Sequence, residues 1–282
     1  MHLIYENKYG IVSMGNTSDR WRILNIKGLN LTDKTYSVVR YSAFGGQETV
    51  YTSSDARIIT ISGDVYSDNL QQEMERALRI FNEEGTLSII SKDKQRLIKC
   101  SQITFNETER TGYYLRFTLQ FICDNPYFFD LFPTVTGVFD TVGLLKTSFT
   151  LPCTFSTRNN SKYILNCGDI TTEPVFKIYA ENVSSESGQE TIGYKITNLT
   201  TNQMIWLKYR AEEGEIITID IPNRCIESSI NGNIIVNISD DTFLNDFSLQ
   251  KGENFINVLN YNVNETVKIE CIHDNLYVEA VY

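Results

Sequence analysis

Histidine is nearly absent from this chain, which limits the catalytic sites that it can build. Among 282 residues only His2 and His273 occur, and a Ser-His-Asp or Cys-His arrangement needs a histidine as its base. His2 lies at the start of the chain, and the Asp-Asn pair after His273 predicts an exposed turn. No nucleophile elbow, Walker loop, dinucleotide fingerprint or HExxH motif occurs. We therefore expect no enzyme, with no catalytic residues and no cofactor.

Paired carboxylates are the one catalytic device that the sequence leaves open, because a glycoside hydrolase needs no fixed spacing between its two acids. Glu83-Glu84 ends a predicted helix, and Glu212-Glu213 precedes a predicted turn. Both pairs are typical of solvated charge. A cell-wall hydrolase is therefore the least favoured function.

Closely spaced metal ligands are also missing. The six cysteines include no Cys-x-x-Cys pair, and two histidines give no zinc signature. Asp240-Asp241 lacks the spacing of an EF-hand loop, so a solvated turn is the better interpretation. We expect no metal. Because nothing directs the chain to an oxidising compartment, we expect free thiols at all six cysteines: Cys100, Cys123, Cys153, Cys167, Cys225 and Cys271.

Clusters of positive charge and long apolar runs do not occur. Lys and Arg number 25 against 35 Asp and Glu, which gives a net charge of −10. Phosphate binding needs clustered cations, so sequence-specific binding of nucleic acid is not expected. No apolar run reaches the roughly 20 residues that span a bilayer, and the first residues lack the pattern of a signal peptide. We expect cytoplasmic synthesis and no membrane insertion.

Two globular domains are expected from the length and from a hydrophobic content of 41%. The pattern of strands breaks off after Phe129, where Pro133, Gly137, Gly143 and Pro152 follow. We place the boundary there, giving domains at 1–131 and 132–282.

The first domain is predicted to be a β-domain with one helix. Strand-like segments run from Tyr5 to Met14 and from Trp21 to Leu31, and Gly45-Gly46 marks a loop over 41–48. Arg57 to Ile61 is β-branched and predicts another strand.

The helix is predicted over 68–84. Ser67 or Asp68 is placed to cap its start, with Gln71 returning the bond, and Gly85 is placed to end it. Helical spacing gives one apolar stripe for the sheet: Leu70, Met74, Ala77, Leu78 and Phe81.

A long strand follows the helix. Apolar side chains occupy every second position from Tyr113 to Cys123, and their alternates are mostly polar. This pattern is typical of a strand with one buried face, and Pro126 ends it.

The second domain has a different rhythm. Short alternating runs recur with Gly, Asn and Asp turns between them, which is typical of an antiparallel β-sandwich. The eight runs are 175–180, 192–198, 204–208, 216–221, 234–238, 255–259, 267–271 and 276–281. A further short strand is placed at 137–142.

Several motifs together resemble one family. The first domain carries an RxIxIxG strand at Arg57, one amphipathic helix, and a long strand that closes on Cys-Asp-Asn-Pro-Tyr at 123–127. The second carries Asn-Cys-Gly-Asp at 166–169 and Glu-Pro-Val-Phe-Lys-Ile at 173–178. It also carries Ile-Thr-Asn-Leu-Thr-Thr at 196–201, Gly-Glu at 214–215 and Phe-Ser-Leu-Gln-Lys-Gly-Glu-Asn at 247–254. In this order they resemble the phage distal tail proteins (Dit), or siphophage tail components, although Gln250 stands where the family has Pro.

The resemblance implies a structural tail-tip or baseplate hub protein with a galectin-like C-terminal sandwich. It implies a homohexameric ring of N-terminal domains that docks on the tail tube protein and on the tail-associated fibre or lysin protein. The C-terminal sandwiches would carry receptor-binding or baseplate proteins, at the virion tail tip or in a tail-like particle. Ring closure would pair the edge of the long strand between subunits.

The alternative is a carbohydrate-binding module that contacts the host cell wall. Trp206 and Tyr209 lie on one segment and form a candidate platform for a sugar ring, to which Tyr163, Tyr179 and Tyr261 could contribute. The His-Asn-Arg-Trp set with which galectins bind galactosides is missing, so galectin-like architecture does not imply lectin activity.

Overall fold

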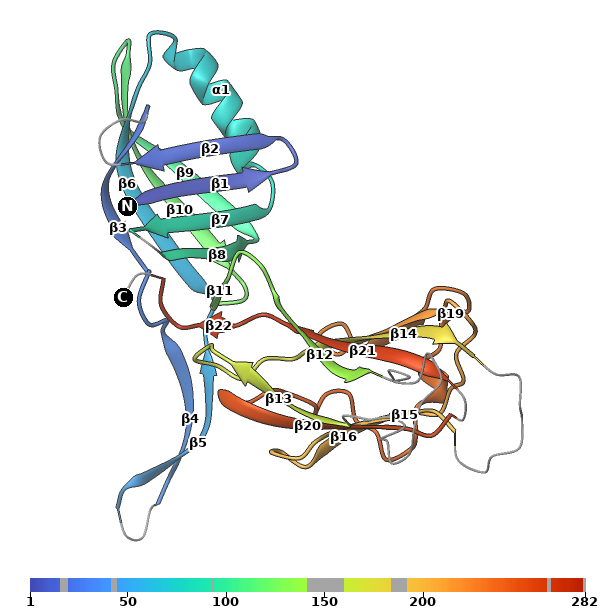
Figure 1. The fold of residues 1–282 in the computed structure, drawn as a ribbon. Coiled ribbons are helices and arrows are strands. Elements are labelled where there is room, and N and C mark those ends of the chain that lie inside the picture. Colours follow the sequence, from blue (N-terminus) through green and yellow to red (C-terminus); the bar gives the residue numbers. More distant parts are fainter. Residues whose placement is uncertain are drawn as a thin grey trace. The chain divides into compact units, whose positions relative to one another are not determined.

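The computed structural model describes residues 1–15, 20–41, 45–92, 94–140, 160–183, 192–262 and 265–280. The chain divides into two compact units (Figure 1). The first unit is Met1–Leu131 with Tyr277–Tyr282, and the second is Phe132–Leu276. No helix of the described chain is long and apolar enough to cross a membrane.

The end of the chain lies with the first unit, which differs from the predicted domain 132–282. Ala280 is buried in the core of the first unit, and its amide donates to the Leu29 carbonyl at 3.2 Å. The Tyr277 hydroxyl donates to Asp130 at 3.0 Å. The second unit is therefore inserted between two segments of the first.

The first unit is built on one ten-stranded sheet with the order β22-β11-β8-β7-β1-β2-β3-β6-β10-β9. β2 and β3 pair in parallel, whereas the other pairs with a described register are antiparallel. The strands are β1 (His2–Asn7), β2 (Gly10–Gly15), β3 (Trp21–Lys27), β6 (Arg57–Tyr66), β7 (Gly85–Ser91), β8 (Lys94–Cys100), β9 (Gln102–Arg110), β10 (Tyr114–Cys123), β11 (Phe128–Phe129) and β22 (Leu276–Tyr277).

The alternating strand predicted from 113 to 123 is β10, and its buried face is confirmed. Leu115, Phe117, Leu119, Phe121 and Cys123 are all fully buried. However, β10 pairs with β6 on one side and β9 on the other. The prediction that an edge of this strand pairs between subunits is therefore wrong. A tight turn connects β9 to β10, and β9 occupies the side of β10 that faces away from β6.

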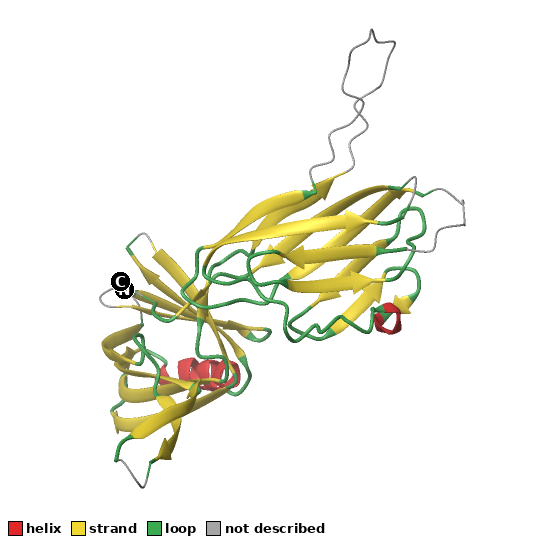
Figure 2. Ribbon diagram, turned by 90° about the horizontal axis from the view of Figure 1, so that it is seen from below, coloured by secondary structure: helices red, strands yellow, loops and turns green. Residues whose placement is uncertain are grey.

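Helix α1 (Leu70–Phe81) packs against this sheet, as Figure 2 shows. Its N-cap is Asn69, whose side chain accepts from the Gln72 amide at 3.2 Å, so the predicted caps at Ser67 or Asp68 are wrong. Gly85 is the first residue of β7 and not a helix stop. A Cβ on Gly85 would lie 2.5 Å from the Glu6 carbonyl, so glycine is needed there for close approach.

The apolar stripe predicted to face the sheet from α1 is correct except for one residue at its edge. Leu70, Met74, Ala77 and Phe81 are buried, but Leu78 is 44% exposed and Ile80 is buried instead. Leu78 and Ile80 flank the stripe on opposite sides. The helix packs on the Ile80 side, where the Asn7 side chain donates to the Ile80 carbonyl at 2.7 Å.

The second unit is a sandwich of a six-stranded and a four-stranded sheet, with the orders β12-β21-β14-β17-β18-β19 and β13-β20-β15-β16. The first sheet contains β12 (Thr134–Asp140), β14 (Val175–Asn182), β17 (Ile216–Asp220), β18 (Cys225–Ser228), β19 (Gly232–Asn233) and β21 (Thr266–His273). The second contains β13 (Ser161–Asn166), β15 (Tyr194–Asn198), β16 (Gln203–Leu207) and β20 (Gly252–Asn260). The predicted fold class, mainly β with one α-helix and a C-terminal sandwich, is confirmed.

Two of the eight predicted runs differ from the structure. The run 234–238 contains the 3₁₀ helix η1 (Ile235–Asn237) in place of a strand. Within its described residues, the run 276–281 forms only the short strand β22, in the sheet of the first unit. The strands β13, β18 and β19 were not predicted, and β12 begins before the predicted 137–142.

A separate hairpin completes the first unit. β4 (Lys34–Arg40) and β5 (Gln47–Ser54) pair with each other in a two-stranded sheet and with no other described strand. The predicted loop at 41–48 overlaps the connection between the two strands, but Gln47 and Glu48 already belong to β5, and residues 42–44 lie outside the described chain.

Candidate functional site

The hairpin β4–β5, here called the arm, is the most exposed regular structure of the first unit. Every residue of β4 is exposed. Tyr36 is 58% exposed, Val39 51% and Val50 65%. A lone two-stranded hairpin is marginally stable in water, and exposed apolar side chains gathered on one element are typical of an interaction surface. The arm therefore has the features of a docking element.

The base of the arm is held firmly. The Thr35 hydroxyl donates to Asp55 at 2.8 Å, and the Asp55 amide donates to the Asp33 carbonyl at 3.0 Å. The Tyr127 hydroxyl donates to Ser54 at 3.1 Å. These bonds fix the start and the end of the hairpin at adjoining positions.

Arg57, the first residue of β6, is the anchor directly behind the arm. Its guanidinium donates to the carbonyls of Pro126 at 2.6 Å, Gly28 at 2.7 Å and Val278 at 2.8 Å, and also to that of Asn30. The group is 2% exposed and lies 4.4 Å from the Phe128 ring centroid.

Burial lowers the pKa of Arg57 to about 10, so it stays charged at neutral pH. The sequence marked Arg57 only as part of a strand motif. Its role as a clamp needs the loop 28–30 and the chain end, which sequence spacing does not reveal.

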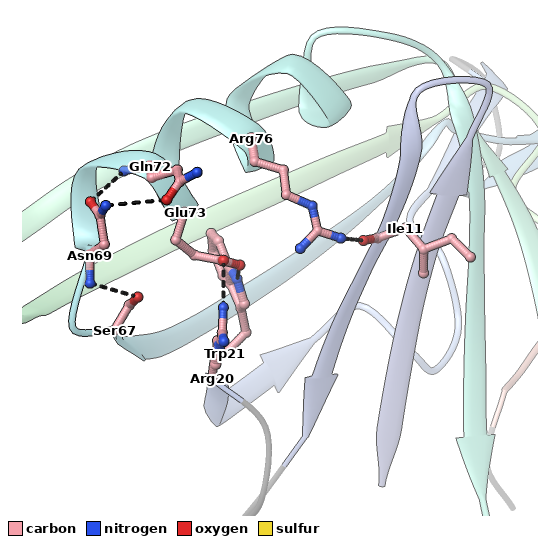
Figure 3. A network of polar contacts seen from close by, with 8 residues as sticks. All are labelled: Ile11, Arg20, Trp21, Ser67, Asn69, Gln72, Glu73 and Arg76. Atoms are coloured by element: carbon pink, nitrogen blue, oxygen red, sulfur yellow. Dashed lines mark hydrogen bonds and ion pairs between the residues drawn. The ribbon is translucent and has the colours of Figure 1, made fainter.

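A polar network fastens α1 to the neighbouring strands, as Figure 3 shows. Glu73 accepts from the Trp21 indole and from Arg20, each at 3.1 Å. Arg76 donates to the Ile11 carbonyl at 3.1 Å. A hollow of about 640 Å³ lies beside this network at the start of the helix. Because its charged groups are paired with the fold itself, the network is structural.

The outer face of α1 carries a second apolar patch. Leu78 and Tyr9, which is 58% exposed, line a hollow of about 550 Å³ with Glu75, Arg79 and Asn82. The exposure of Leu78 is what a helix side chain in a subunit interface would show in the isolated chain.

The structure does not bring Trp206 and Tyr209, the two residues of the predicted sugar platform, together in one cluster. The Tyr209 hydroxyl donates to buried Glu215 at 2.8 Å and accepts from Asn231 at 2.8 Å. Desolvation, and then this bond to Glu215, raises the pKa of Tyr209. Glu215 also accepts from the Glu212 amide at 2.6 Å. Tyr209 thus fastens a loop.

Trp206 lies instead beside Tyr261, with ring centroids 5.8 Å apart. The ammonium of Lys208 lies 4.9 Å from the Trp206 ring centroid and that of Lys195 lies 5.6 Å from it. Among the described residues neither lysine forms an ion pair. The Trp206 indole donates to the Ile192 carbonyl at 3.2 Å. This cluster, Lys195, Trp206, Lys208 and Tyr261, is here called the Trp206 cluster.

His273 lies inside the second unit, so the predicted exposed turn at this residue is wrong. It is 2% exposed, and neither ring nitrogen has a hydrogen-bond partner in the described part of the chain. Desolvation lowers the pKa of His273. The reason is its place as the last residue of β21, on the face that also buries Val267, Ile269 and Cys271.

Glu265 is a second buried ionisable group of this unit. One carboxylate oxygen accepts from the Tyr194 hydroxyl at 2.8 Å and from Asn262 at 3.1 Å, and the other has no partner in the described segments. Desolvation raises the pKa of Glu265. His273 and Glu265 therefore both favour their neutral forms. The described residues contain no group of three or more potential metal ligands.

Comparison with known proteins supports one family. Residues 167–272 match the siphovirus-type tail component, C-terminal domain. No curated protein matches the sequence. The crystal structure of Dit from phage SPP1, described as a paradigm of the hub adsorption apparatus in phages that infect Gram-positive bacteria, matches with a TM-score of 0.65. The match covers 98% of this chain and 99% of that chain at 12% identity.

A component of the activated phage P2 baseplate with calcium matches with a TM-score of 0.51. That match covers 96% of this chain and 97% of the other, again at 12% identity. At such identity these two likenesses show a shared fold. Together with the family match they confirm the resemblance drawn from the sequence motifs.

Proposed function

We propose that this chain, whose residues 167–272 match the siphovirus-type tail component and whose fold is similar to that of Dit from phage SPP1, is the structural hub of a tail tip or baseplate. It acts without catalysis, as a homohexameric ring of first units. The ring joins the tail tube protein to the tail-associated fibre or lysin protein. The second units carry receptor-binding or baseplate proteins. The protein is made in the bacterial cytoplasm and ends in the virion tail tip or a tail-like particle.

The arm is the observation that carries this proposal. Its apolar side chains are exposed on both strands although its base is clamped by Arg57 and Asp55. An element that is anchored but uncovered gains most by packing against a second copy, because burial of apolar surface contributes roughly 25 cal/mol per Å². A closed ring lets every arm find the same partner surface.

The test is the assembly state of the purified full chain at rising concentration. Wild-type protein is expected to form rings with an axial hole in electron micrographs and a hexameric mass in solution. The triple variant Tyr36→Ser, Val39→Ser, Val50→Ser is expected to stay monomeric with an unchanged melting temperature. The matched control Leu165→Ser changes a residue that is 53% exposed on β13 and should leave the rings intact. Protein that stays monomeric at every concentration, together with assembled tails that contain no ring of it, would overturn the proposal.

A second candidate function rests on the Trp206 cluster. In a chain with a net charge of −10, two ammonium groups without a described carboxylate partner flank one aromatic ring. An aromatic ring with adjacent cations suits an anionic glycan, because the ring packs on a sugar face and the cations pair with its acid groups.

This candidate is tested by titrating the full chain with a polyol-phosphate wall polymer and with neutral dextran. Micromolar binding of the anionic polymer that Lys195→Gln and Lys208→Gln weaken, and Lys34→Gln does not, would favour the binding module. Equal, millimolar binding of both polymers would remove it.

A further inference from the structure

Two cysteines meet in the core of the first unit. Cys100 is the last residue of β8 and Cys123 is the last residue of β10. Their sulfur atoms lie 3.5 Å apart, and the residues are 2% and 0% exposed. The five described cysteines are free thiols, and Cys153 lies outside the described residues.

The backbone around this pair brings the two chain segments together. β8 and β10 are not neighbours in the order of the sheet. The chain nevertheless turns at Ser101, whose amide donates to the Ile122 carbonyl at 2.9 Å. Sulfur atoms in van der Waals contact need to approach by roughly 1.5 Å to reach the 2.05 Å of a disulfide bond. Side-chain rotation supplies part of such a movement.

A route for a reagent lies on one side of the pair. Cys100 lines a hollow of about 550 Å³ together with Gly85, Lys99, Asp124 and Asn125. Cys100 therefore borders a hollow, although the residue itself is 2% exposed. Cys271, which is also fully buried, lines none of the described hollows.

We propose that Cys100 and Cys123 form an intrachain disulfide when the protein leaves a reducing environment. The oxidant is a small disulfide such as oxidised glutathione. The Cys100 thiolate attacks one glutathione sulfur and releases one glutathione thiolate. Cys123 then attacks the Cys100 sulfur of the mixed disulfide and releases the second glutathione. The two thiols lose two protons and two electrons in total, and one oxidised glutathione becomes two reduced ones.

The reaction is slow while the protein is folded at neutral pH. The contact with Cys123 and burial together raise the pKa of Cys100 strongly, so little thiolate is present. Once formed, the bond ties the corner between β8 and β9 to the end of β10. A cross-link of this kind stabilises a fold mainly by restricting the unfolded chain. If the proposed tail function holds, the hub folds in the cytoplasm with both cysteines reduced, and the disulfide forms after the host cell lyses.

The test uses the full chain incubated with oxidised glutathione at pH 8.5, followed by thiol counting in denaturant and peptide mapping. Wild type is expected to lose two of its six thiols beyond any that exposed Cys167 loses to a mixed disulfide, to yield one linked peptide pair containing Cys100 and Cys123, and to melt at a higher temperature. A reductant should reverse all three changes.

Cys100→Ser and Cys123→Ser should keep all their remaining thiols or end as mixed disulfides. The matched control Cys271→Ser should still lose two. Circular dichroism of each variant shows that it is folded. Six thiols after prolonged oxidation, or a link that involves another cysteine, would overturn the proposal. A failure to form rings would bear on the tail function alone, because the thiol count does not depend on assembly.

Discussion

The guanidinium of Arg57 lies 2.8 Å from the carbonyl oxygen of Val278 and so joins two residues that are 221 positions apart. The same group holds the loop before the arm and the residue that ends the long strand. One buried cation, paired only with carbonyls among its described partners, therefore connects the arm, the sheet and the chain end.

Removing this clamp should destabilise the first unit. Arg57→Leu removes the donor from one buried and three part-buried hydrogen bonds to carbonyls. Because each such group costs roughly 1–3 kcal/mol, the loss should be at least about 3 kcal/mol. Urea denaturation measures it. The control Arg22→Leu, on an exposed side chain of β3, should change stability by no more than roughly 0.5 kcal/mol. Equal effects of the two changes would contradict the clamp.

The two margins of α1 should respond differently to truncation. Ile80→Ala removes a side chain that is 2% exposed and should cost roughly 2–5 kcal/mol. Leu78→Ala changes a residue that is 44% exposed and should cost less than about 1 kcal/mol. Thermal melts of the two variants provide the comparison. A large loss from Leu78→Ala in the monomer would mean that this side chain packs in the core after all.

Acidification should weaken the second unit through His273. Its pKa is lowered in the folded protein, so between that value and roughly 6.5 the unfolded chain binds more protons. The free energy of unfolding therefore falls as the pH drops through this window. Denaturation curves at pH 7.5 and 5.5 should show the loss, and His273→Gln should reduce it. His2→Gln is the control and should leave the difference unchanged.

Glu265 should act with the opposite sign. Its pKa is raised above 4.5 in the folded state, so its stabilising contribution is complete below 4.5 and is lost as the pH rises through the raised value. Glu265→Gln keeps the bond to Tyr194 and removes the charge. We expect this variant to be more stable than wild type at pH 7.5 and equal to it at pH 4. A variant that is less stable at both values would show that the carboxylate is needed.

The parts of the fold that follow strict periodicity could be predicted from the sequence. β10 was predicted because every second side chain from 113 to 123 is apolar, and the sheet buries all of them except Tyr113, which lies just before the strand. The burial of His273 could also be predicted from the sequence, because this residue continues the alternation of Val267, Ile269 and Cys271. The Asp-Asn pair after it favours a turn, but the turn begins only after the buried end of the strand.

Other parts left no such signal. The arm has no buried face among its described side chains, so its strands show no alternation, and the sequence indicated only the loop at Gly45-Gly46. The clamp at Arg57 depends on carbonyls, which every residue carries. The partner of Trp206 is Tyr261, more than fifty positions away, and only the pairing of β15 with β16 and β20 brings them together.

The second unit should fold without the first. Its sandwich has its own core, and residues from Tyr277 onward belong to the other unit. A fragment of residues 132–276 is therefore expected to melt cooperatively, and a fragment of 132–282 should melt at the same temperature, because residues from Tyr277 onward belong to the first unit. The converse protein, the full chain cut after Leu276, should keep the melting transition of the second unit. It should lose stability in the first, where Arg57 and Leu29 lose their bonds to Val278 and Ala280. Differential scanning calorimetry of the three proteins separates these transitions. If 132–282 melted well above 132–276, the chain end would stabilise the second unit and the assignment of these residues would be wrong.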